Sequence, residues 1–332
     1  MGDAGGDVVA RAARLADDEL FPTAAAIDVA DAMPSSRLDL LAGAGLYGVA
    51  GPRWAGGSEL DLPALCGVVE ALAGGDLATA FVWVQHHGAV RVLSGEQAPP
   101  ALRDAELGPL CRGEQRAGLA LPGLHPGPSS LTATASGDGW VLDGTAPWVT
   151  GWGLVDLVLV AARTQDDTVV WSLVEAVERP GLTAERLVLA AANASVTVEL
   201  RFAGVPVAAD RVVMVTPYDP TAWTSGGDLR LNGSLALGVA GRCCRLLGGG
   251  PIDDELEACR AALDTASPRD MPAARAAASA FAVKAATTLV VATGSRAALR
   301  GAPAERLVRE ALFLLVFGSR PAIKSALLDR LA

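Results

Sequence analysis

The sequence is poor in several residues on which other protein classes depend. Its 332 residues include two lysines (Lys284 and Lys324), three histidines and five cysteines, and the formal net charge is −10. Nucleic-acid-binding proteins usually present a basic face, so this charge balance argues against that class. The cysteines form no CxxC pair and are odd in number, and we recognise no cleavable signal segment. We therefore expect reduced thiols in a cytoplasmic protein.

Several common functional patterns are also missing from the sequence. No uninterrupted run of about 18 apolar residues occurs, so we expect no membrane span. His86, His87 and His125 lack a nearby Cys, His or Asp pattern, and no metal site is predicted. No glycine-rich dinucleotide motif follows a first predicted strand, and the sequence contains no phosphate-binding loop and no nucleophile elbow.

The residues that are present divide the chain into three zones. Hydrophobic residues make up 51% of the sequence, which is typical of a packed globular protein. Helical spacing predicts a helical domain over residues 1–116, with a break at Gly74–Gly75. Alternating and β-branched segments predict a β-barrel-like domain over 117–215, and helical spacing returns in a bundle over 216–332. The predicted fold class is therefore α+β and multidomain.

Local signals refine this prediction for the middle and last zones. Gly137–Gly139 and Asp143–Gly144 are typical of hairpin turns, and the zone has material for about seven strands. The helix predicted over 273–299 is rich in small residues, which suits close packing between helices.

Several strings, in order along the whole chain, resemble the acyl-CoA dehydrogenase family. They are APWVTG (146–151), FAGVPVAADRVV (202–213), LNGSLALGVAGRCCRLL (231–247) and AERLVREA (304–311). The resemblance implies the helices–sheet–helices fold and an FAD cofactor. It also implies dimers or tetramers formed through the C-terminal bundle, to which the helix at 273–299 is suited.

The resemblance assigns cofactor contacts residue by residue. Trp148 and Thr150 match the residues that pack on the flavin ring and hydrogen-bond near its N5 atom. Main-chain groups of Leu119 and Leu121 would reach the ring oxygens, although Ala120 and Leu121 replace the family's Thr-Glu pair. The remaining expected contacts are Ser129 or Ser130 with the pyrophosphate, and Gly294 in a second FAD-contacting segment. The family's Arg-x-x-Phe-Gly motif is not recognisable.

The catalytic base departs from the family pattern. Phe317 stands before Gly318-Ser319, where most members have the glutamate that removes the α-proton. Some members carry the base ten residues before a packing glycine, and counting back from Gly238 gives Asp228. Asp228 is therefore either a relocated base or an N-terminal helix cap.

His86 and His87 are further acid–base candidates, because they lie on a helix that borders the family's active cavity. A satisfied core or surface histidine remains the alternative for each of them.

Three functions follow from these observations. The first is FAD-dependent α,β-dehydrogenation of an acyl-CoA or related acyl thioester, with an electron-transferring flavoprotein or related subunit as partner. The second is a non-redox protein or partner subunit of the same fold, which the missing glutamate would explain. The third is a flavin-dependent monooxygenase of that fold, assisted by a histidine.

Overall fold

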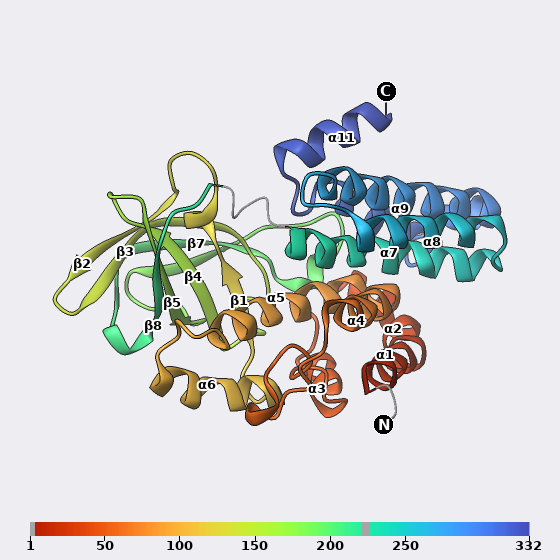
Figure 1. Cartoon of the computed structure of the whole chain (residues 1–332). Helices are drawn as coiled ribbons and strands as arrows, with labels where there is room; N and C mark the ends of the chain where they lie inside the picture. The colour runs from red at the N-terminus through yellow and green to blue at the C-terminus, as the bar shows by residue number, and fades with distance from the viewer. Residues whose placement is uncertain (1–3, 221–225, 332) are drawn as a thin grey trace.

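The computed structural model describes residues 4–220 and 226–331, which form helices, one mixed sheet and helices again (Figure 1). This order confirms the predicted fold class. The last helix before the sheet ends at Arg112 and the first strand begins at Ala117.

The N-terminal helices begin and end where the sequence places caps and breaks. Asp61 and Asp76 are N-cap residues, whose carboxylates accept hydrogen bonds from the backbone N–H groups of Ala64 and Thr79. The predicted break at Gly74–Gly75 is confirmed, because one helix ends at Gly75 and the next begins at Leu77. The helices are α1 (Ala4–Leu15), α2 (Phe21–Asp28), α3 (Ser36–Gly43), α4 (Leu62–Gly75), α5 (Leu77–Leu93) and α6 (Pro100–Arg112).

The middle zone is one sheet of eight strands, in the order β6-β7-β3-β2-β4-β5-β8, with β1 paired to β4. The sequence suggested about seven strands, one fewer than the structure has. The strands are β1 (Ala117–Ala120), β2 (Leu131–Ser136), β3 (Gly139–Val149), β4 (Leu157–Arg163), β5 (Thr168–Glu175), β6 (Leu182–Arg186), β7 (Val198–Val207) and β8 (Val212–Pro217).

One of the two predicted hairpin turns is confirmed and the other is wrong. Ser136 pairs with Gly139 across the turn that joins β2 to β3. Asp143 and Gly144, however, lie inside β3, where the pairing with β7 shifts register. Gly144 has φ +122°, and a Cβ there would lie 2.1 Å from the Ser130 carbonyl oxygen. The glycine therefore serves a β-bulge and a close backbone approach, which a turn pattern cannot distinguish.

The C-terminal zone is a helical bundle. Its longest helix, with the 3₁₀ turn that follows it (Met271–Ala298), is long and apolar enough to cross a membrane, and 44% of its most apolar window is buried. It packs against the helices on either side of it in sequence. The helices are α7 (Gly226–Leu247), α8 (Pro251–Thr265), α9 (Met271–Thr293), α10 (Pro303–Val316) and α11 (Pro321–Leu331).

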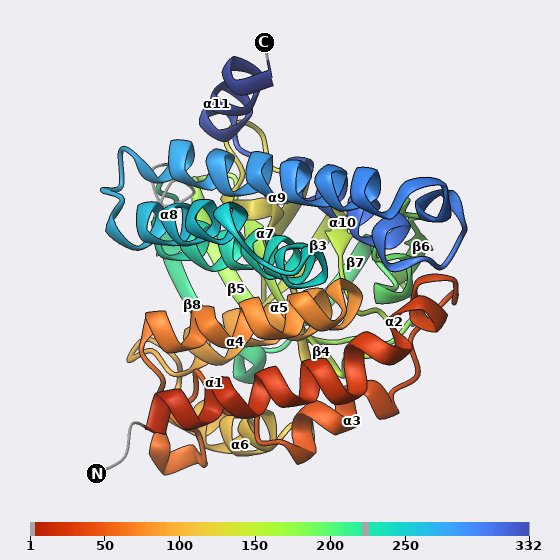
Figure 2. The same ribbon diagram turned by 90° about the vertical axis from the view of Figure 1, so that its right-hand side faces the viewer.

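The two helical zones pack directly on each other. Figure 2 shows α4 and α5 lying between α1 and α7, with the sheet behind them. A Cβ at Gly238 of α7 would lie 2.4 Å from the Glu70 carbonyl oxygen of α4, so only glycine allows this approach. The helix-packing role expected for Gly238 therefore agrees with the structure.

Charged side chains cross the same seam between the N- and C-terminal helices. Arg309 of α10 forms a hydrogen-bonded ion pair with Asp28 of α2, and Arg242 of α7 pairs with Asp17. Within α10, Arg306 pairs with the buried Glu310. Burial raises the pKa of Glu310 from 4.5 to about 7, and Arg306 opposes this shift.

Candidate functional site

Trp148 stands at the end of β3 in an unusual backbone conformation. Its φ is +64°, a left-handed value that is rare for a bulky side chain, and the indole is 63% exposed. The β3–β7 register also shifts between Ala146 and Val149, so Trp148 lies in a bulge. Strain of this kind persists where the surroundings enforce it and is frequent at functional sites. The bulge presents an exposed aromatic side chain at the C-terminal end of β3.

Thr150, two residues after this tryptophan, lies inside the protein. Its side chain is buried, and its hydroxyl is 3.3 Å from the Thr197 hydroxyl, which in turn is 3.0 Å from that of Ser195. The predicted partner Leu119 is half-buried in β1, against Gly88 of α5. These contacts join the end of β3 to the segment before β7 and β1 to α5.

The loop over residues 121–130 is held by a buried arginine that the sequence analysis missed. Arg163, at the end of β4, donates to the carbonyl oxygens of Gly123 (3.0 Å) and Gly127 (2.8 Å). The Tyr218 ring covers its guanidinium at 3.5 Å. An arginine that ends the apolar string LVLVAAR was the available signal. Because its donors point at the loop, Arg163 positions backbone there.

Ser129 and Ser130 lie at the end of this loop. Their hydroxyls donate to the carbonyl oxygens of Leu131 (2.7 Å) and Thr145 (2.9 Å), so each hydroxyl must rotate before it can donate to a phosphate oxygen. Ser129 also borders a hollow of about 550 Å³. The hollow is lined by Gly127, Pro128, Ser129, Thr132, Arg163, Thr164, Asp167 and Tyr218.

Asp228 is the third residue of α7, in the first turn, where the helix dipole favours a carboxylate. Its Oδ1 lies 3.4 Å from Nη2 of Arg91 at the end of α5, and the two side chains are 56% and 44% exposed. Arg320, in the turn between α10 and α11, is also close. Burial lowers the pKa of Arg320, and the charge of Asp228 opposes that shift. Asp228 is thus half exposed and paired with Arg91.

His86 and His87 lie inside the protein, 1% and 0% exposed. The His86 Nδ1 accepts a hydrogen bond from the Ala117 backbone N–H at 3.2 Å and so ties α5 to β1. Burial lowers the pKa of His86 to about 3 and that of His87 well below its usual value. Both imidazoles are therefore neutral near pH 7, and the structure does not bring either of them to Asp228.

Phe317 occupies the end of α10 as part of an aromatic group. Its ring is 4.9 Å from that of Phe81 in an edge-to-face arrangement and stacks on Phe313 at 5.8 Å between centroids. Gly318 follows it and lies against Asn232, one turn after Asp228 on α7. Phe317 is thus a packing residue beside the Asp228 end of α7, with no group that could accept a proton.

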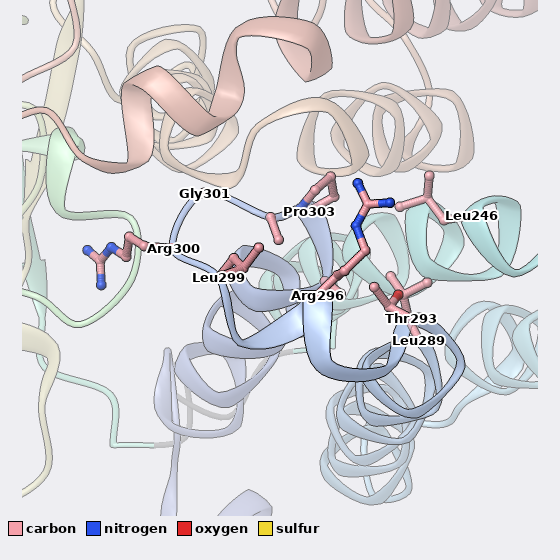
Figure 3. Close-up of a pocket in the computed structure, with 10 residues that line it drawn as sticks. Leu246, Leu289, Thr293, Arg296, Leu299, Arg300, Gly301 and Pro303 are labelled. Atoms are coloured by element: carbon pink, nitrogen blue, oxygen red, sulfur yellow. The ribbon is translucent and has the colours of Figure 1, made fainter.

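Gly294 lies at the other end of the bundle. It follows α9, next to a hollow of about 570 Å³ between α7 and the loop before α10 (Figure 3). Leu246 of α7 and Arg296 line this hollow. From Asp228 to Leu246 the helix rises about 27 Å, at 1.5 Å per residue. Within one chain, Gly294 is therefore remote from the Asp228 end of the bundle.

Together, Trp148 at the end of β3 and the loop held by Arg163 fit a flat aromatic cofactor such as a flavin. The exposed Trp148 offers a stacking face, and the arginine-fixed loop carries the Ser129 and Ser130 hydroxyls. Sequence strings identified these residues, but they could not show the bulge that exposes the indole.

Comparisons with known proteins point to one family. The family described as acyl-CoA dehydrogenase, N-terminal domain, matches residues 6–114. The chain is 29% identical to the benzylmalonyl-CoA dehydrogenase of Aromatoleum aromaticum over 52% of this chain and 47% of that protein. It is 30% identical to the human mitochondrial short-chain specific acyl-CoA dehydrogenase, over 45% and 37%. The matches thus span less than half the length of these relatives.

A solved structure resembles almost the whole chain. The butyryl-CoA dehydrogenase of Megasphaera elsdenii superimposes with a TM-score of 0.85 at 20% identity, over 99% of this chain and 97% of that one. At this identity the similarity shows the fold.

Proposed function

Because the chain belongs to the acyl-CoA dehydrogenase family, we propose that it binds FAD and dehydrogenates an acyl thioester between its α and β carbons. The observation that carries the proposal is the exposed side chain of Trp148, which has a left-handed φ in the bulge at the end of β3. A second observation, the half-exposed Asp228, supplies the acid–base group that the family position at Phe317 lacks.

In this proposal, different residues of the chain bind the cofactor and remove the α-proton. Trp148 would provide a stacking face for the isoalloxazine ring, and the Ser129 and Ser130 hydroxyls, rotated from Leu131 and Thr145, would donate to the pyrophosphate. FAD, when bound, supplies the acceptor for the hydride that leaves the β-carbon. Asp228 accepts the α-proton on its carboxylate and becomes neutral. Arg91, 3.4 Å away, orients that carboxylate through their ion pair.

We further propose that the chain works as a homodimer or homotetramer. Gly294 and the hollow beside it lie at the far end of the bundle from Asp228. In an oligomer they would contact the FAD bound by a second copy of the chain, and not the FAD of their own chain. An electron-transferring flavoprotein or related subunit is the proposed acceptor of the electrons.

The test is spectroscopic. The purified chain is incubated with FAD, separated from free cofactor and mixed anaerobically with pentanoyl-CoA or glutaryl-CoA. We expect a bound-flavin spectrum that bleaches when a thioester is added. A colourless protein after this treatment would contradict FAD binding. A spectrum that neither thioester bleaches would contradict dehydrogenation of these acyl groups.

A non-redox or partner-subunit role is the second candidate. It is favoured by Phe317, which offers no carboxylate, and by the pairing of Asp228 with Arg91. For this role we expect thioester binding, measured by calorimetry, without flavin absorbance. The two candidates therefore differ in one measurement on the same sample.

A further inference from the structure

The guanidinium of Arg163 holds three carbonyl oxygens of the loop over residues 121–130. Its Nε donates to Gly123 (3.0 Å), its Nη1 to Gly127 (2.8 Å), and its Nη2 to Gly123 (2.8 Å) and His125 (2.5 Å). An arginine side chain has five N–H donors, and these four hydrogen bonds use all but one of them. The side chain is also buried. Arg163 therefore acts on the loop and has little left with which to bind a ligand.

The loop depends on this side chain because its own backbone offers few donors. Pro126 and Pro128 directly follow the carbonyl groups of His125 and Gly127, and proline has no N–H group. Gly127 has a left-handed φ of +82°, which continues neither a helix nor a strand. The order of the loop, which ends in Ser129 and Ser130, thus comes from a side chain outside it.

Tyr218, one residue after β8, covers the same guanidinium. Its ring centre lies 3.5 Å from the guanidinium carbon, and its hydroxyl donates to the His125 carbonyl oxygen at 3.4 Å. Its backbone N–H donates to the carbonyl oxygen of Asp167, whose carboxylate lies 3.9 Å from Nη1 of Arg163. Tyr218 begins the stretch that leads from the sheet to α7, and Asp228 follows it by ten residues.

We propose that Arg163 and Tyr218 are positioning residues that couple the cofactor-contacting loop to the segment leading to Asp228. The inference rests on the proposed function, in which flavin accepts a hydride and Asp228 a proton from neighbouring carbons of one acyl group. Such a reaction requires both acceptors to be held in a fixed relation to the acyl group. One guanidinium in contact with both segments supplies that relation.

The first test concerns the loop. Arg163→Lys keeps the charge but loses the planar fork that reaches three carbonyl oxygens. The dissociation constant of FAD, measured by fluorescence titration, should rise about tenfold. Should Arg163→Lys fail to fold, the Tyr218 variants decide alone.

The second test concerns the coupling. Tyr218→Leu removes the ring, and the rate of flavin reduction by pentanoyl-CoA or glutaryl-CoA at saturating FAD should fall about tenfold. Tyr218→Phe keeps the ring and should restore that rate to within about twofold of the wild-type rate. Stopped-flow absorbance measures both rates. If Tyr218 only stabilised the fold, Tyr218→Leu would melt at a lower temperature but keep the wild-type rate at saturating FAD, which would overturn the coupling.

The matched control is Trp54→Leu, because Trp54 also has an arginine, Arg103, over its ring at 5.9 Å but lies outside the sheet. It should change neither the FAD affinity nor the reduction rate. Wild-type FAD affinity in Arg163→Lys would likewise overturn the inference and leave the proposed function standing. A wild-type chain that binds no FAD, or whose flavin neither thioester reduces, would overturn the two together.

Discussion

At the scale of single residues, sequence strings located the candidate site but not its geometry. APWVTG identified Trp148, yet the left-handed φ and the bulge depend on how β3 pairs with β7. The spacing from Gly238 identified Asp228, while its neighbours Arg91 and Arg320 come from remote parts of the chain. Such contacts follow from tertiary packing, which no local pattern records.

Trp148→Ala should weaken FAD binding about tenfold, because the stacking face is lost. The measurement is the dissociation constant of FAD by fluorescence titration. Trp54→Ala is the matched control, since Trp54 is 62% exposed but lies in the turn Arg53–Ala55, outside the sheet. Equal effects in the two variants would refute the stacking role of Trp148.

Asp228→Asn should slow flavin reduction by a bound acyl thioester about 10²–10⁴-fold, because an amide cannot accept the α-proton. FAD affinity should stay unchanged, and stopped-flow absorbance measures the rate. The control, Asp39→Asn, removes a carboxylate that is similarly exposed and also paired to one arginine, Arg116. Wild-type rates in Asp228→Asn would reassign Asp228 to stabilising the start of α7.

At the scale of elements, the sequence predicted helices and their breaks better than the path of the strands. Gly74–Gly75 ends α4 as predicted, because glycine and the Asp76 cap act locally. Asp143–Gly144 carries the residues of a turn but forms a bulge, because β7 and the Ser130 carbonyl oxygen occupy the space beside it. Strand partners distant in sequence decide that outcome.

Two consecutive helix caps allow a sharp stability test. Asp61→Ala should lower the free energy of unfolding by about 1 kcal/mol, the usual value of an N-cap. Asp76→Ala should lower it by about 3–5 kcal/mol, because Asp76 also pairs with the buried Arg37 at 3.3 Å. Chemical denaturation measures both changes. Similar values for the two variants would mean that the buried ion pair adds nothing beyond the cap.

At the scale of the whole molecule, the seam between the two helical zones depends on a titrating group. The pKa of Glu310 is raised to about 7 in the folded chain, against 4.5 as its ordinary value. The folded state therefore holds a proton that the unfolded state has lost between these pH values. The contribution of Glu310 to stability is full below pH 4.5 and is lost as the pH rises through 7.

Glu310→Gln should remove this dependence. Between about pH 4.5 and 7, wild-type stability should fall relative to that of the variant by up to about 1.4 kcal/mol per pH unit. Urea denaturation at several pH values measures the difference. The control is Glu255→Gln, which changes a surface carboxylate paired with Lys284. Its unfolding free energy should change with pH in the same way as that of the wild type. If the unfolding free energy of Glu310→Gln also changes with pH as that of the wild type does, the raised pKa of Glu310 is contradicted.

The ion pair of Arg309 with Asp28 joins residues 281 positions apart, and this separation has a consequence for synthesis of the chain. Translation proceeds from the N-terminus, so α2 and α4 leave the ribosome long before α7 and α10 exist. Until then their apolar faces, which later pack on the C-terminal bundle, are exposed. Exposed apolar segments of an incompletely folded chain are prone to aggregate. We therefore expect the nascent chain to depend on chaperones up to the emergence of α10, and truncation before Pro303 to give insoluble protein.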